Sequence, residues 1–152
     1  MNDDERALMM LEKSIYEAKK TLEKEHIFRP FAMILDENGS IRKLENEIED
    51  MQASYMELHD EIMAHVQMRQ GTDVNVLLTN ASMPDQLLEE GLESCIRVHL
   101  EERSQQHKTI ASRFIYVPYQ LQRLSGKEEV EAKLFHPKVI SFPSEFFKKE
   151  ES

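Results

Sequence analysis

The side chains best suited to chemistry lie in the segment 94–103, SCIRVHLEER, where apolar and polar residues alternate. This alternation is typical of a strand with one buried and one solvated face. On the polar face His99 would lie beside Glu101, and Arg113 would join them from the following strand. Because the pKa of histidine lies near neutrality, a histidine held between an arginine and a carboxylate could take part in acid–base catalysis. These three residues are candidates for the site of an enzyme or a small-ligand-binding domain.

A simpler interpretation is that opposite charges on neighbouring strands stabilise an exposed sheet face. Acid–base catalysis also requires a pocket, and no pattern in the sequence indicates one. None of the four glycines belongs to a phosphate-binding loop, and no serine lies in a nucleophile-elbow motif. We therefore favour a protein that is not an enzyme, and we expect no cofactor.

A second cluster lies on the predicted helix 47–69, where Glu57, Glu61 and His65 recur every four residues. This spacing places them on one helical stripe, where they could bind a metal ion with a further ligand from elsewhere. The same spacing is common on solvated acidic helices, and a chain with one cysteine has no thiolate pair for zinc. We predict no metal site.

The segment 34–41, ILDENGSI, begins like a calcium-binding loop because polar side chains alternate from Asp36 onward. Counted from Asp36, a loop of the EF-hand type needs glycine at its sixth position, where this chain has Ile41. The flanking residues are typical of strands. A three-residue turn over 37–39 would set Leu35 opposite Ile41, with the glycine in the left-handed conformation. We predict a hairpin turn.

The elements that must position these residues follow from hydrophobic periodicity. Two long amphipathic helices are predicted over 3–25 and 47–69, with a short helix over 82–91. The expected core stripe of the first helix is Leu8, Leu11, Ile15, Ala18 and Leu22. Strands are predicted over 26–36, 40–45, 73–80, 94–103, 109–119 and 129–136.

The order α-β-β-α-β-(short α)-β-β-β predicts an α+β fold with a mostly antiparallel sheet of five to six strands and the two main helices on one face. This order resembles that of roadblock and profilin-like small domains, and the resemblance implies a scaffold or regulator of other proteins. We expect a single domain over 1–136 and a C-terminal tail over 137–152. The tail is too apolar for a free end, so we expect it to dock in part on the domain.

Composition limits the partners. With 29 acidic and 19 basic side chains the net charge is −10, which disfavours nucleic acids and anionic membranes. No apolar run approaches the roughly 20 residues of a membrane-spanning helix, and the start, MNDDER, is unlike a signal peptide. The single cysteine, Cys95, fits a reducing compartment and a small buried side chain. We expect a cytoplasmic protein.

Both predicted long helices also carry apolar residues outside their core stripes. Met9 and Tyr16 are seven residues apart on the first helix, away from its core stripe, and Met56 and Met63 repeat this on the second helix with His59 between them. Methionine and tyrosine are enriched in interface cores. We expect a protein-binding or scaffold module that contacts a protein partner, or a second copy of itself as a homodimer, through these helix faces.

Overall fold

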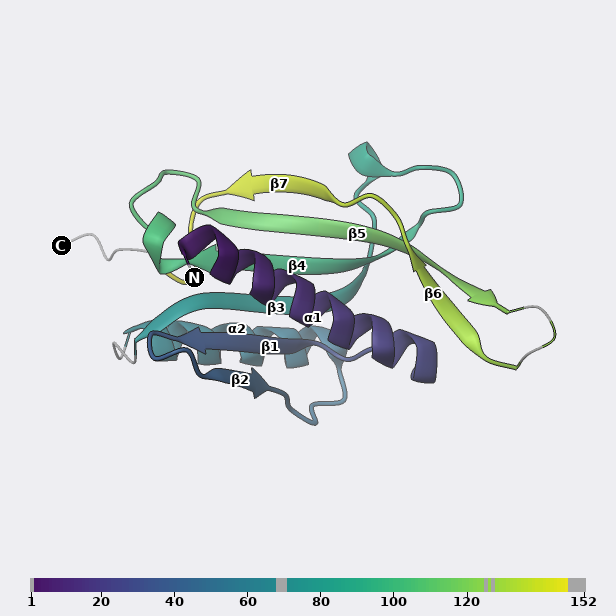
Figure 1. Ribbon diagram of the computed structural model, residues 1–152, viewed down its shortest axis with the longest axis horizontal. Coiled ribbons are helices and arrows are strands. Elements are labelled where there is room, and N and C mark those ends of the chain that lie inside the picture. Colours follow the sequence, from purple (N-terminus) through teal and green to yellow (C-terminus); the bar gives the residue numbers. More distant parts are fainter. Residues whose placement is uncertain (1, 68–70, 125, 127, 148–152) are drawn as a thin grey trace.

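The structure is a computed structural model that describes residues 2–67, 71–124, 126 and 128–147 (Figure 1). It confirms an α+β fold with an antiparallel sheet. The helices are α1 (Asp3–Glu25) and α2 (Met51–Gln67). The strands are β1 (Phe31–Asp36), β2 (Ile41–Leu44), β3 (Thr72–Ser82), β4 (Ser94–Glu102), β5 (Ser112–Arg123), β6 (Val130–Leu134) and β7 (Lys138–Phe142). Their order in the sheet is β2-β1-β3-β4-β5-β6, and β7 pairs with the first half of β5.

The two helices pack on opposite faces of the sheet. In β1, Met33 and Leu35 belong to the core beneath α1, whereas Ala32 and Ile34 belong to the core beneath α2. Successive residues of a strand point to opposite faces, so the prediction that both helices lie on one face is wrong. The segment 31–35 is buried throughout, and such a continuous apolar run is the sequence signal of a strand covered on both sides.

Helix α1 spans the residues predicted for it. The side chain of Asn2 accepts a hydrogen bond from the backbone of Glu5, which caps the first turn, and His26 ends the helix in the left-handed conformation, at φ 67°. Its buried residues are Ala7, Met10, Ser14, Ala18 and Leu22. Ala18 and Leu22 are buried as predicted, and Leu11 and Ile15 pack against the core. In the first half of the helix Ala7 and Met10 are buried instead, and Leu8, expected in the core, is 55% exposed.

Helix α2 begins at Met51, four residues later than predicted. Asp50 caps it by accepting a hydrogen bond from the backbone of Ala53, while the side chain of Asn46 accepts one from Ser54 Oγ. The predicted end of this helix, 68–69, lies outside the described residues. None of the described helices is long and apolar enough to cross a membrane.

The hairpin between β1 and β2 confirms the predicted register, since Leu35 faces Ile41 and Ala32 faces Leu44. Gly39 adopts φ 87°, the left-handed conformation that the turn requires. The segment 34–41 is therefore a turn that sets the register of the two strands.

Strand β7 was not predicted from the sequence. It lies within the segment assigned to the tail and brings the sheet to seven strands. After β7, residues 144–147 cross the face that carries α2, where Phe146 and Phe147 join the core with Leu58 and Ile62 of α2. The predicted short helix over 82–91 is a single 3-10 turn, Asp85–Leu87.

Candidate functional site

His99 and Glu101 lie in the interior of the molecule. They are 0% and 1% exposed, because residues 144–147 cover this face of β4. The ring of His99 is stacked between Phe114 and Phe146, with centroid distances of 4.4 and 4.3 Å. The expectation that the polar face of this strand is solvated is therefore wrong.

Arg113 does not join these two residues. It pairs in register with Leu100, whereas His99 pairs with Phe114, so Arg113 lies on the opposite face of the sheet. There its guanidinium donates to the carboxylate of Glu102. The predicted group of three is thus split between the two faces, and the prediction that Arg113 lies beside His99 is wrong.

The carboxylate of Glu101 holds the C-terminal segment. It accepts hydrogen bonds from Ser144 Oγ at 2.5 Å and from the backbone N–H groups of Glu145, Phe146 and Phe147 at 2.9, 3.0 and 3.3 Å. Burial raises the pKa of this carboxyl, but the hydrogen bonds from His99 and Ser144, the charge of His99 and the N–H of Glu145 outweigh burial and leave the pKa below its ordinary value. Glu101 is therefore an ionised anchor beneath the segment 144–147.

The contact of His99 with Ser112 resembles part of a catalytic triad but lacks its geometry. Nε2 of His99 is 2.6 Å from Glu101 and 2.8 Å from Ser112, so both partners share one ring nitrogen. In a triad the acid and the nucleophile lie on opposite nitrogens. Ser112 is also fully buried, so a substrate could not reach it. Within the described residues Nδ1 of His99 is buried and has no hydrogen-bond partner.

A second histidine lies against the same segment. Nε2 of His59, on α2, is 2.9 Å from a carboxylate oxygen of Glu145, and its ring is 4.9 Å from that of Phe146. Three residues, His59, His99 and Glu145, each offer one ligand atom, and these three atoms lie within 4.8 Å of one another. This is a possible metal donor set.

The cluster of Glu57, Glu61 and His65 considered in the sequence does not form such a donor set within the described residues. The histidine-rich set above comes from three elements that are distant in sequence: α2, β4 and the segment after β7. Spacing along one helix could not have found it.

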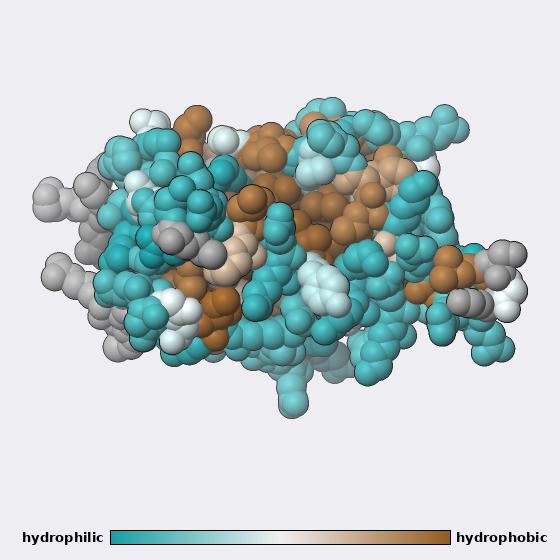
Figure 2. Space-filling model, in the orientation of Figure 1, coloured by the Kyte–Doolittle hydropathy of each residue, from teal (hydrophilic) through white to brown (hydrophobic). Residues whose placement is uncertain are grey.

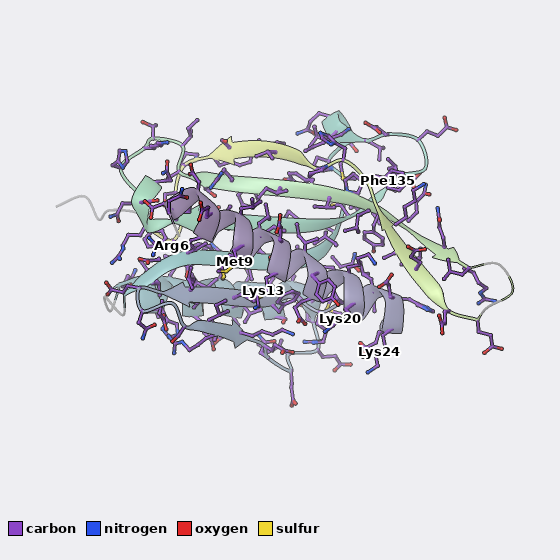
Figure 3. All side chains as sticks on the ribbon, in the orientation of Figure 1. Arg6, Met9, Lys13, Lys20, Lys24 and Phe135 are labelled. Atoms are coloured by element: carbon purple, nitrogen blue, oxygen red, sulfur yellow. The ribbon has the colours of Figure 1, made fainter. Side chains whose placement is uncertain are left out.

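The predicted partner-binding residues are dispersed. Met9 and Met63 pack against the two cores, and His59 contacts the C-terminal segment. Tyr16 and Met56 are exposed, at 60% and 49%. Figure 3 shows Met9 on the side of α1 nearer β1. Because the two helices lie on opposite faces, Tyr16 and Met56 do not form one surface.

An open apolar groove of about 450 Å³ runs beside β7. Its lining residues are Phe114, Tyr116, Phe142, Pro143, Ser144 and Glu145. Helix α2 packs over β1 and β3, and residues 144–147 cover His99 and Glu101. The groove therefore lies on the sheet face that carries α2, next to residues 144–147.

A polar cleft of about 760 Å³ lies at the start of α1. Arg6, seen at the first turns of the helix in Figure 3, bonds to Asp73 at 3.0 Å, and Arg103 bonds to the same carboxylate at 2.5 Å. The cleft also contains Glu102, which is buried and has one carboxylate oxygen without a hydrogen-bond partner among the described residues. The Arg6–Asp73 pair ties α1 to β3 of the sheet.

Some residues around Glu101 that the sequence analysis did not name could have been found from the sequence, and others could not. Ser112, on β5, pairs in register with Glu101. Asn75, on β3, pairs with Glu101 from the other side, and its buried amide has no partner in the described part of the chain. A strand register would have indicated both. Ser144, Glu145 and Phe146 carry no such signal, since they follow a proline in an irregular segment.

Comparison with known proteins found no matching family model, no matching curated protein and no matching solved structure.

Proposed function

We propose that this protein is a binding module that captures an extended segment of a protein partner at the edge strand β7. The observation that carries the proposal is the outer edge of β7, which pairs with no other strand of the described sheet. Every second residue of such an edge directs its N–H and C=O groups outward, where an added strand can bond to them.

The other edges of the sheet carry charges that discourage pairing. Strand β2 is four residues long and includes Arg42 and Lys43, and β6 carries Glu131 and Lys133. In β7, KVISF, the only charged residue is Lys138, and its ammonium is paired with Glu89 at 2.5 Å. Charged side chains on an edge strand protect against strand addition, so β7, whose one charged residue is paired, is the least protected edge of the described sheet by charge.

Strand β7 presents an exposed apolar side chain on each face of the sheet. Val139 pairs in register with Ile115, a core residue beneath α1, and is 56% exposed. Phe142, 41% exposed, lies in the groove on the other face. Figure 2 shows apolar side chains gathered between α1 and β7. A strand added to β7 would direct alternate side chains to these two surfaces.

The charge of the chain defines the partner further. A net charge of −10 attracts basic proteins, and Glu145 lies in the wall of the groove with its side chain 43% exposed. We therefore propose a partner segment that alternates apolar residues and carries lysine or arginine. Two copies of this chain would repel each other, which makes a second copy the weaker occupant.

The test is selection of extended peptides from a random library on the immobilised protein, followed by affinity measurement for the selected peptides. Val139→Lys and Phe142→Lys alter exposed side chains on the two sides of β7 and should weaken binding about tenfold or more, since an edge lysine opposes strand addition. Tyr16→Lys and Met56→Lys are matched controls on the two helices. Binding that is lost in the helix variants and kept in the β7 variants would place the partner on the helix faces instead.

A further inference from the structure

We propose that His59, His99 and Glu145 bind one divalent transition-metal ion, with Zn²⁺ as the expected species. This inference does not depend on the proposed partner. It begins with the geometry, in which one ligand atom from each residue lies within 4.8 Å of the other two. In a tetrahedral zinc site with metal–ligand bonds near 2.0–2.2 Å, ligand atoms lie about 3.4 Å apart, so pairs of these atoms would have to approach each other by up to about 1.4 Å.

The bonding of His99 supports the assignment. A histidine that binds a metal uses one ring nitrogen and donates from the other to a carboxylate or carbonyl group. In His99 one nitrogen, Nε2, already has the carboxylate of Glu101 at 2.6 Å, while Nδ1 is buried and unpartnered among the described residues. The ring is 0% exposed, so water does not compensate that nitrogen at the surface. One nitrogen can be held by Glu101 while the other serves a metal.

The donor types indicate the class of ion. Two imidazoles and one carboxylate suit Zn²⁺ and its neighbours in the first transition row, whereas Mg²⁺ and Ca²⁺ prefer sets of oxygen ligands. The side chains of His59 and Glu145 are 14% and 43% exposed, which gives an ion a path from solvent. Three protein ligands leave a coordination position for water.

Such an ion would join three elements. His59 lies on α2, His99 on β4, and Glu145 in the segment that Glu101 anchors. A metal held by all three would fasten residues 144–147 to the sheet and to α2. Binding to the native state alone raises the thermal midpoint of unfolding, which provides a second readout.

The experiment uses the full chain, freed of metal with a chelator and titrated with Zn²⁺ by calorimetry, with metal content measured after dialysis. We expect one Zn²⁺ per chain, a higher thermal midpoint, and no competition from Mg²⁺ or Ca²⁺. His59→Asn and Glu145→Gln change the two partly exposed ligands and should each weaken binding at least tenfold. The matched controls His136→Asn and Glu61→Gln, at exposed positions, should leave it unchanged.

Circular dichroism verifies that each variant is folded, and Co²⁺ in place of Zn²⁺ reports the ligand geometry through its visible absorption. His99 is part of the core, so the proposal does not rely on replacing it. A chain that takes up no Zn²⁺, or one that binds it equally well in the His59→Asn and Glu145→Gln variants, overturns the proposal. Loss of binding in the control variants alone would place the ion on the surface and overturn it as well.

Discussion

Glu101 combines almost complete burial with five hydrogen-bonding contacts, four of which come from the C-terminal segment and one from His99. A carboxylate removed from water keeps its charge only where donors replace the lost solvation. Here most of the donors are backbone N–H groups of residues 145–147. The charge of one strand residue therefore orders a segment more than 40 positions away in the chain.

Replacing this anchor should release the segment. Glu101→Gln keeps one acceptor oxygen but sets an amide N–H₂ group against backbone donors, so we expect unfolding free energy to fall by about 3 kcal/mol. Hydrogen exchange at the amides of 145–147 should become fast. Glu131→Gln, at an exposed position on β6, is the control. Unchanged exchange at 145–147 in Glu101→Gln would contradict the anchoring role.

The pKa of Glu102, the next residue, is shifted in the opposite direction from that of Glu101. Burial raises its pKa above the ordinary value of 4.5, with Arg113 opposing the shift. With the higher pKa in the folded state, the native protein binds more protons than the unfolded chain in this range, so stability falls as pH rises through 4.5 and past the raised pKa. Glu102→Gln should remove this loss.

Urea denaturation at several pH values measures the effect. The unfolding free energy of the wild type should decrease relative to that of Glu102→Gln as pH rises through that window. A difference between wild type and Glu102→Gln that stays constant with pH would show that Glu102 titrates normally.

Cys95 illustrates what the sequence did predict at this scale. The sequence predicts a small buried side chain at this position, and the residue is 0% exposed. Burial raises the pKa of its thiol to about 11, and only the thiolate reacts with alkylating reagents. We expect negligible alkylation of the native protein at neutral pH and rapid alkylation in denaturant. Fast labelling without denaturant would contradict this burial.

For the helices and strands, hydrophobic periodicity predicted the bounds and register of single segments. It did not predict which other segment packs over them. The bounds of α1 and the register of the β1–β2 turn follow from caps, spacing and one glycine, all of which are local. The burial of His99 does not follow from local signals. The alternation in β4 shows which residues are polar, but it contains no information that residues 144–147 cross over them. Strand β7 was missed because Pro137 and Pro143 on either side suggested an irregular tail.

The C-terminal segment offers a matched pair of phenylalanines for testing its packing. Phe146 is 2% exposed and touches His59 and His99, whereas Phe142 is 41% exposed. Phe146→Ala should lower the unfolding free energy by about 3 to 4 kcal/mol, and Phe142→Ala by less than about 1 kcal/mol. Chemical denaturation measures both. Equal losses would mean that the segment does not pack as a part of the core.

At the scale of the whole molecule, the position of the two helices determines which surfaces remain for a partner. The sequence could suggest apolar helix faces, and the structure places α1 and α2 on opposite sides of the sheet, with Met9 and Met63 packed against the cores. No single-residue pattern predicts which face a helix covers, because that depends on the order of the strands. The groove and the edge of β7 exist only in the assembled sheet.

The proposed binding of a partner along β7 can be tested in its native setting. The most direct measurement is photo-crosslinking in the native cell extract, with the crosslinking residue placed at Val139, Tyr16 or Met56 in otherwise identical full-length chains. All three side chains are exposed, at 56%, 60% and 49%, so each variant should fold. We expect a discrete crosslinked protein, basic in composition, from position 139 and none from 16 or 56. Crosslinking from 16 or 56 with none from 139 would contradict it.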